Sequence, residues 1–231
     1  MSNIYSEYQA KIIANSEEKY RQFHMSLNPG IENILGVRSP QMKQLAKELA
    51  KDNWREYFTQ NEHKYFEETL LQGLAIGFMK IPLEDIMPEI RAFLPYVNGW
   101  AICDSFCAGL KVAQKEPVAF WELIRECCES NKPYYVRFAV VMMLAHFVND
   151  EYIDEILQRL GAISSDEYYV KMGVAWAVSV CFVKQRKKTF EFLKSDCTLD
   201  RETYNKSLQK IRDSFRVSPE DKEQLKKIKR C

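Results

Sequence analysis

Apolar residues recur three or four positions apart along most of the chain, as Tyr8 and Ile12 do near its start. This spacing places them on one face of an α-helix. No segment between turn signals sustains the alternation of apolar and polar residues that is typical of a strand. The pattern predicts helices at 3–25, from Ser39-Pro40, from Trp54, and at 65–80, 83–94, 99–112, 118–128, 134–148, 152–160, 168–184, 189–193, 200–215 and from Ser218-Pro219. The predicted fold class is therefore all-α.

Polar residues ahead of two of these segments are expected to cap the helices. Ser39 is a suitable N-cap, and Pro40 suits the first helical position. Ser164, Ser165 and Asp166 are expected to cap the helix at 168–184 in the same way.

Two of the predicted helices repeat each other. The segment YYVRFAVVMML at 134–144 matches YYVKMGVAWAV at 168–178, with an offset of 34 residues. Helix pairs that recur at such intervals are typical of an α-solenoid. The sequence therefore predicts a single domain over 1–231, an α-solenoid of HEAT-like antiparallel helix pairs (an α/α superhelix). The second helix of each pair would line a concave groove.

Composition indicates the compartment in which the protein is expected but does not indicate its function. The chain has 231 residues, a formal net charge of +1 and seven cysteines. The start of the chain has no basic region followed by an apolar run, and no stretch approaches the roughly 20 apolar residues of a membrane span. We expect reduced cysteines, a cytoplasmic protein and no membrane association. A net charge near zero neither indicates nor excludes nucleic-acid binding.

Unusual side chains fall on the predicted inner helices. Trp100 and Asp104 are four residues apart and share a helix face. Asp104 is either a paired or solvated surface group, or a carboxylate held in a cleft for a purpose. Arg137 lies inside a strongly apolar helix and needs an anion or carbonyl groups, so it either pairs with Asp104 or a neighbouring helix, or contacts a phosphate. Trp176 is either a core residue or part of the same groove. Lys171 matches Arg137 in the repeat and is expected in that groove.

Several familiar sites are missing from the sequence. There is no phosphate-binding glycine motif, so we expect no nucleotide cofactor. The three histidines are scattered, and Cys127 and Cys128 are adjacent, which suits no common zinc spacing. Cys103 and Cys107 are interpreted as two buried thiols. The sequence therefore predicts neither a metal site nor a cofactor.

The remaining constellation resembles a known family. Trp100 and Asp104 in GWAICDSF, Arg137 in YYVRFAVV and Trp176 in YYVKMGVAW are similar to the AlkD-type DNA alkylation repair glycosylases, which are built from HEAT-like repeats. The segment GVRSPQMKQLAKE also resembles that family's GV-x-[ST]-P segment. The resemblance covers roughly residues 31–216, in the right order.

The resemblance implies a monofunctional DNA glycosylase. Such enzymes excise positively charged 7-alkylguanine and 3-alkyladenine from duplex DNA by hydrolysing the N-glycosidic bond, without flipping the base. Asp104 would stabilise the oxocarbenium-like sugar and orient water. Trp100 and Trp176 would complete the catalytic site by packing on the sugar–phosphate backbone. Arg137 and Lys171 would hold phosphates.

Further contacts and alternative functions follow from the same pattern. Lys184 and Arg186 belong to a basic cluster after the helix at 168–184 and are additional candidate DNA contacts. The expected partner is double-stranded DNA that carries alkylated bases, and the protein is expected to act as a monomer. One alternative is a HEAT-like protein that binds DNA structures without catalysis, and the other is a protein-interaction scaffold.

Overall fold

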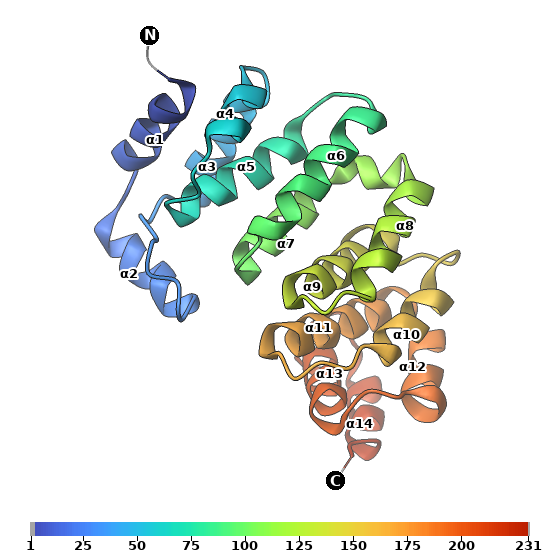
Figure 1. Cartoon of the computed structure of the whole chain (residues 1–231). Coiled ribbons are helices and arrows are strands. Elements are labelled where there is room, and N and C mark those ends of the chain that lie inside the picture. The colour runs from blue at the N-terminus through green and yellow to red at the C-terminus, as the bar shows by residue number, and fades with distance from the viewer. Residues whose placement is uncertain (1–2, 231) are drawn as a thin grey trace. The chain divides into compact units, whose positions relative to one another are not determined.

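The computed structural model of the chain describes residues 3–230, except for the side chain of Asp196. This part of the chain forms 14 α-helices, four short 3-10 or π-helical turns and no strand (Figure 1). The all-α class predicted from the hydrophobic pattern is therefore confirmed. No helix among the described residues is long and apolar enough to cross a lipid bilayer.

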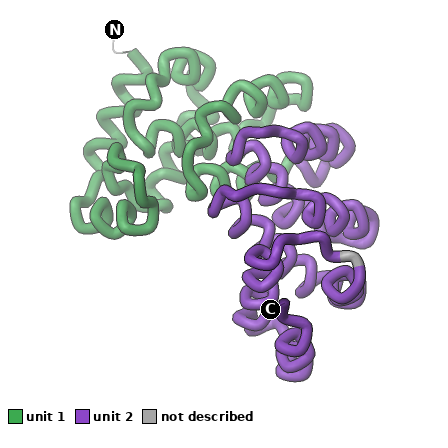
Figure 2. The backbone as a smooth tube through the Cα atoms, turned by 60° about the horizontal axis from the view of Figure 1, so that its bottom comes forward, with its two compact units in different colours: residues 1–112 green, residues 113–231 purple. Residues whose placement is uncertain are grey.

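The chain divides into two compact units, Met1–Val112 (unit 1) and Ala113–Cys231 (unit 2), which Figure 2 colours separately. Each unit is described here by itself. The expectation of a single domain over 1–231 and of one groove that runs through it stays a prediction.

Unit 1 contains seven α-helices and a 3-10 turn. They are α1 (Ile4–Ala14), α2 (Glu18–Leu27), α3 (Ser39–Leu49), α4 (Trp54–Gln60), α5 (Phe66–Phe78), α6 (Leu83–Phe93), the turn at Leu94–Tyr96 and α7 (Trp100–Gly109). Helix α5 packs against both α3 and α7, while α1 packs against α4. The helices α3, α5 and α7 therefore form a row of successive inner helices.

Unit 2 repeats this arrangement. Its elements are α8 (Pro117–Cys128), α9 (Pro133–Met142), a π-helical turn (Met143–Phe147), α10 (Ile153–Ala162), α11 (Tyr168–Lys184), α12 (Arg186–Glu191), a second π-helical turn (Phe192–Asp196), α13 (Arg201–Asp213) and α14 (Pro219–Lys227). Helix α11 packs against α9 and α13, and α10 packs against α12. This alternation of inner and outer helices is consistent with helical repeats.

The sequence of each helix explains its layer. The outer helix α6 buries only Ile86, Ile90 and Phe93, which lie on one face. The inner helix α5 is buried along almost all of its length, because it has helices on more than one side. Its second half, from Gly73 to Phe78, is apolar as such an environment requires, whereas Glu67, Glu68 and Gln72 in its first half are buried polar residues.

The start of the chain differs from the prediction. One helix was expected at 3–25, but the structure has α1 and α2 separated at Asn15 to Glu17. The backbone N–H of Glu17 donates to the carbonyl of Gly36 (3.1 Å), and Ser16 forms an antiparallel bridge with Val37. These contacts with a distant loop replace the helical hydrogen bonds, so the amphipathic spacing alone could not reveal the break.

Two expected caps also differ. Arg38 is the N-cap of α3, and Ser39 is the first helical residue. Glu167 is the N-cap of α11 and makes no side-chain capping bond, so the Ser164 to Asp166 segment lies before the helix start. The six cysteines within the described residues are free thiols, Cys103 and Cys107 are buried, and Cys231 lies outside the described residues.

Candidate functional site

Helix α7 begins at Trp100 and places the indole at its first turn. Gly99 is the N-cap, and a side chain there would meet Ile31 at 3.0 Å. The indole Nε1 of Trp100 donates to the carbonyl oxygen of Leu27 at 3.1 Å. Leu27 is the last residue of α2, so the orientation of this half-buried indole depends on a helix more than 70 positions away in the sequence.

Asp104 follows one turn later on α7 and is half-buried. Behind it, α7 crosses α5 at very close range: a Cβ atom added to Gly77 would lie 3.0 Å from the backbone of Gly109. Glycine at this crossing lets the two backbones approach, which side chains would prevent. The close crossing leaves a shallow hollow on the surface beside Asp104.

This hollow is a pocket of about 620 Å³ within unit 1. Its lining residues come from α3, α5, α7 and the 3-10 turn after α7 (Lys111–Gln114): Lys43, Lys47, Leu74, Gly77, Phe78, Asp104, Ser105, Ala108, Gly109 and Lys111. The floor is apolar or small, and the charged groups are three lysines and one carboxylate. Such a pocket can accept an uncharged ring or sugar beside a carboxylate, with cations at its edge for an anion.

A buried carboxylate holds the loop that precedes α3. Glu67 of α5 is fully buried and accepts hydrogen bonds from the backbone N–H groups of Leu35 (2.9 Å), Gly36 (2.8 Å) and Val37 (3.3 Å). Gly36 has φ of +87°, and a side chain there would collide with the backbone of Arg21. The loop conformation therefore needs glycine, and the carboxylate satisfies its amides.

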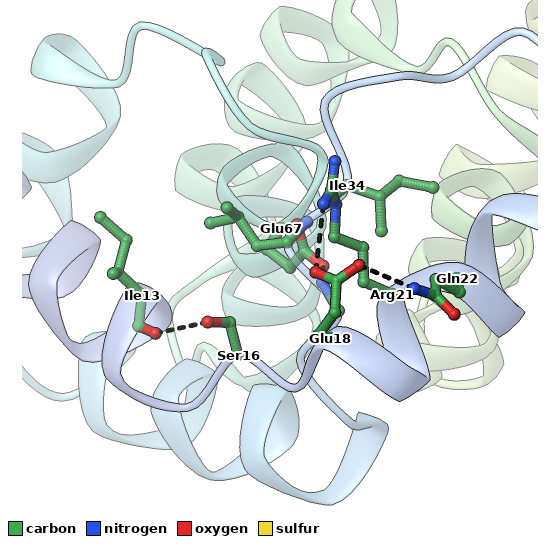
Figure 3. Close-up of polar contacts among 9 residues, drawn as sticks. Ile13, Ser16, Glu18, Arg21, Gln22, Ile34 and Glu67 are labelled. Atoms are coloured by element: carbon green, nitrogen blue, oxygen red, sulfur yellow. Dashed lines mark hydrogen bonds and ion pairs between the residues drawn. The ribbon is translucent and has the colours of Figure 1, made fainter.

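The same loop is joined to α2 on its other side. Arg21 Nε donates to the carbonyl of Ile34 at 3.0 Å, next to the pair formed by Glu18 and Gln22 (Figure 3). Helix α2 buries none of its residues, so contacts of this kind are what hold it in place. Because Leu27 ends α2, the loop held by Glu67 indirectly supports the acceptor of the Trp100 indole.

In unit 2, Arg137 is built into the contact between α9 and α11. Its side chain is 5 % exposed, and Nη1 donates to the backbone carbonyl of Tyr169. Gly173 lies against this side chain, since a Cβ there would be 3.4 Å from Nη1, which is close to ordinary van der Waals contact. The sequence left open a carbonyl, an ion pair or a phosphate, and the carbonyl of a neighbouring helix is present. Its contact with a DNA phosphate stays a prediction.

Lys171 and Trp176 both lie on α11 but in different environments. Lys171 pairs with Glu202 at 2.8 Å, and this hydrogen bond raises the pKa of the lysine. Trp176 is 37 % exposed, so the alternative of a core tryptophan is excluded. An exposed indole between buried neighbours in the middle of α11 is available to a ligand.

The two basic residues after this helix also differ. Lys184 is exposed at the end of α11. Arg186 makes a two-point contact with Asp221, and this contact lowers the pKa of the Asp221 carboxyl. Arg186 thus ties α12 to α14, and a DNA contact would have to compete with that bond.

The structure therefore brings together Trp100 and Asp104 in unit 1, and Arg137 with the helix of Lys171 and Trp176 in unit 2. The two sets belong to different units, and their meeting in one groove stays a prediction. Among the described residues, no group of three or more histidine, cysteine or acidic side chains could hold a metal ion.

Sequence analysis missed the three lysines of the pocket. Lys43 and Lys47 are four residues apart on α3, which is the spacing that puts two side chains on one helix face. That signal is visible in the sequence but is common on exposed helices. The role of Leu27 has no sequence signal, because the acceptor is a backbone carbonyl.

Comparison with known protein families agrees with the resemblance seen in the sequence. A family model described as DNA alkylation repair enzyme matches residues 5–211. The match includes the helices that carry Trp100, Asp104, Arg137 and Trp176. A comparison with curated proteins finds no match.

Proposed function

The chain belongs to the DNA alkylation repair enzyme family, and from this premise we propose that it is a monofunctional DNA glycosylase. It would hydrolyse the N-glycosidic bond of 7-alkylguanine and 3-alkyladenine in duplex DNA, with the base left in the stack. The observation that carries the proposal is the position of Asp104, one turn after Trp100 on α7 and at a pocket edged by lysines.

Hydrolysis of this N-glycosidic bond chiefly requires a negative charge beside the deoxyribose. An alkylated purine is already cationic and is a good leaving group, so protonation of the base is unnecessary. As the bond breaks, positive charge develops on the deoxyribose. The Asp104 carboxylate stabilises that charge and orients the attacking water.

The two tryptophans would confine the sugar. Trp100 has a fixed indole because its Nε1 is bonded to Leu27, so its ring face is presented without a loss of side-chain freedom on binding. Trp176 offers an exposed ring on α11. Electron-rich ring faces favour a developing cation.

The candidate DNA contacts of unit 2 differ in availability. Lys184 is exposed and can meet a phosphate directly. Lys171 and Arg186 exchange their acidic partners for phosphate if they bind DNA. Arg137 acts from a buried position and retains its bond to α11.

Single-turnover release of 7-methylguanine from a duplex oligonucleotide tests the proposal. We expect Asp104→Asn to slow release by about 10²–10³-fold, because an amide preserves the shape but removes the charge that stabilises the transition state. Asp85→Asn, which removes an exposed carboxylate of α6, is the matched control and should retain the wild-type rate.

The other outcomes identify the alternatives. Unchanged release by Asp104→Asn would contradict the assigned catalytic residue. If the wild-type protein binds the duplex but releases no base, the protein is a DNA-binding member of the family without this chemistry. If it neither binds DNA nor releases base, the scaffold alternative is favoured.

A further inference from the structure

Three lysines edge the pocket beside Asp104, and none of them was among the DNA contacts expected from the sequence. We propose that Lys43, Lys47 and Lys111 form a phosphate-binding rim for the DNA strand that carries the damaged nucleotide. The inference rests on the proposed function and deepens it, since it assigns the strand next to the reacting sugar to unit 1.

The lysines are placed and available for such a role. Lys43 and Lys47 lie one turn apart on α3, and Lys111 begins the 3-10 turn that follows Leu110, the C-cap of α7. All three side chains are exposed. Within residues 3–230, none of the three ammonium groups forms an ion pair, so no salt bridge has to be broken for a phosphate to bind.

The pocket floor explains why the lysines surround a space and do not fill it. Gly77 and Gly109 bring α5 and α7 together, and Ala108 adds only a methyl group. The ring of Phe78 lies under Lys47, with the ammonium group 5.5 Å from the ring centroid. This contact holds the exposed lysine beside Phe78 at the pocket edge.

The charge arrangement favours a nucleic-acid strand over a small anion. An isolated anion that entered the pocket would approach the Asp104 carboxylate as well as the lysines, and the two effects oppose each other. A DNA strand separates its charges: phosphates contact the lysine rim, while an uncharged sugar occupies the floor before Asp104. Lysine is a compact point charge that suits phosphate contacts without base specificity.

Binding of a short duplex oligonucleotide, followed by fluorescence anisotropy over a series of salt concentrations, tests the rim. Log K falls as log salt rises, and each lost phosphate contact makes this negative slope shallower by about 1. We therefore expect the double variant Lys43→Gln/Lys47→Gln to have a slope that is shallower by about 2. It should also bind damaged and undamaged duplexes more weakly, to the same extent.

The matched control is Lys19→Gln/Lys51→Gln, which removes the same charge from exposed lysines of unit 1 that do not line the pocket. Its slope should stay near that of the wild-type protein. Equal slopes for the rim variant and the control variant would overturn the proposal, because the effect would then reflect net charge alone.

Base release, measured in parallel, separates this inference from the proposed function. If the wild-type protein releases base and the rim variant binds DNA as the control variant does, the phosphate-binding role of the rim is contradicted while the proposed glycosylase activity is supported. If the wild-type protein releases no base but the slope of log K against log salt is still shallower in the rim variant, the phosphate-binding rim is supported and the proposed glycosylase activity is contradicted.

Discussion

In unit 1 the buried carboxylates of Glu67 and Glu68 are satisfied by neutral donors, whereas in unit 2 several acidic side chains are paired with lysine or arginine. Glu67 accepts three backbone N–H groups, and Glu68 accepts Tyr5 Oη (3.0 Å), Gln9 Nε2 (2.8 Å) and the backbone N–H of Tyr65 (3.0 Å). Both carboxylates are fully buried. No cation is needed to hold either of them.

Unit 2 uses its cations within the fold. Glu155 binds Trp121 Nε1 together with Arg125 and Arg159, and these bonds, with that of Arg125 the strongest, lower the pKa of Glu155 to about 2. The other pairs are Lys171 with Glu202, Arg186 with Asp221, and Lys188 with Asp154.

This difference explains why unpaired lysines surround the pocket of Asp104. Where buried acids take backbone amides and hydroxyl groups as donors, basic side chains remain on the surface for an external anion. Three ion pairs of unit 1, Lys11 with Glu7, Arg21 with Glu18 and Arg38 with Glu17, join side chains near α1, α2 and the start of α3 and involve none of the pocket lysines. A count of basic residues along the sequence therefore overstates the cations that unit 2 offers to DNA.

The largest expected effect comes from the buried acid of unit 1. Glu67→Gln keeps the size of the side chain but turns an NH₂ group toward backbone N–H donors, so at least one buried amide loses its acceptor. We expect a loss of about 3 kcal/mol in the free energy of unfolding, measured by urea denaturation. Glu62→Gln, at an exposed position, is the control and should change stability by less than about 0.5 kcal/mol. A small effect of Glu67→Gln would show that neutral donors are not what holds this unit.

The pH dependence of folding stability should also differ between the two units, and this effect is smaller than that of Glu67→Gln. Burial lowers the pKa of His63 in unit 1 from 6.5 to about 4, so between these values the unfolded chain binds a proton that the folded protein does not. The protonation of His63 therefore lowers the free energy of unfolding as the pH falls from 6.5 toward 4. The contribution of Glu155 in unit 2 is present above pH 4.5 and is lost only as the pH falls toward about 2.

Melting temperatures of the wild-type protein and two variants over this pH range test the assignment. His63→Asn should remove part of the slope between pH 4 and 6.5, and Asn tolerates the φ of 52° at this position. Glu155→Gln should lower the melting temperature above pH 4.5, and this difference from the wild-type protein should shrink as the pH falls from 4.5 toward about 2. An unchanged slope in His63→Asn would mean that this histidine does not set the acid sensitivity.

The smallest expected effect is a gain. Glu202→Gln removes the nearer acidic partner of Lys171, at 2.8 Å, and leaves only the exposed Asp166 at 3.9 Å, so the lysine should strengthen duplex binding and make the salt dependence steeper by about 1 in the slope of log K against log salt. Glu191→Gln makes the same change in net charge at an exposed position of α12 and is the control. The gain should vanish in Lys171→Gln/Glu202→Gln. If it persists there, or if the control matches it, pairing does not limit the use of Lys171.

The site was only partly visible in the sequence. Trp100 and Asp104 could be found because four-residue spacing on one helix is a local property. Arg137 was marked by its charge within an apolar helix, and Glu67 carries the same signal in YFEETLL but was passed over. Lys43 and Lys47 could not be ranked above other surface lysines, because their value depends on the absence of an acidic neighbour on other helices.

The sequence by itself determined the all-α class, most helix positions and the family, because the helical period and a set of spaced side chains are written along one chain. It located α11 at Tyr168–Lys184, where a long apolar segment ends at charged residues. The tertiary structure alone decided the break between α1 and α2, the bond from Trp100 to Leu27, and which cations are engaged. Each of these depends on hydrogen bonds or ion pairs between residues far apart in sequence, and no local pattern encodes such partners.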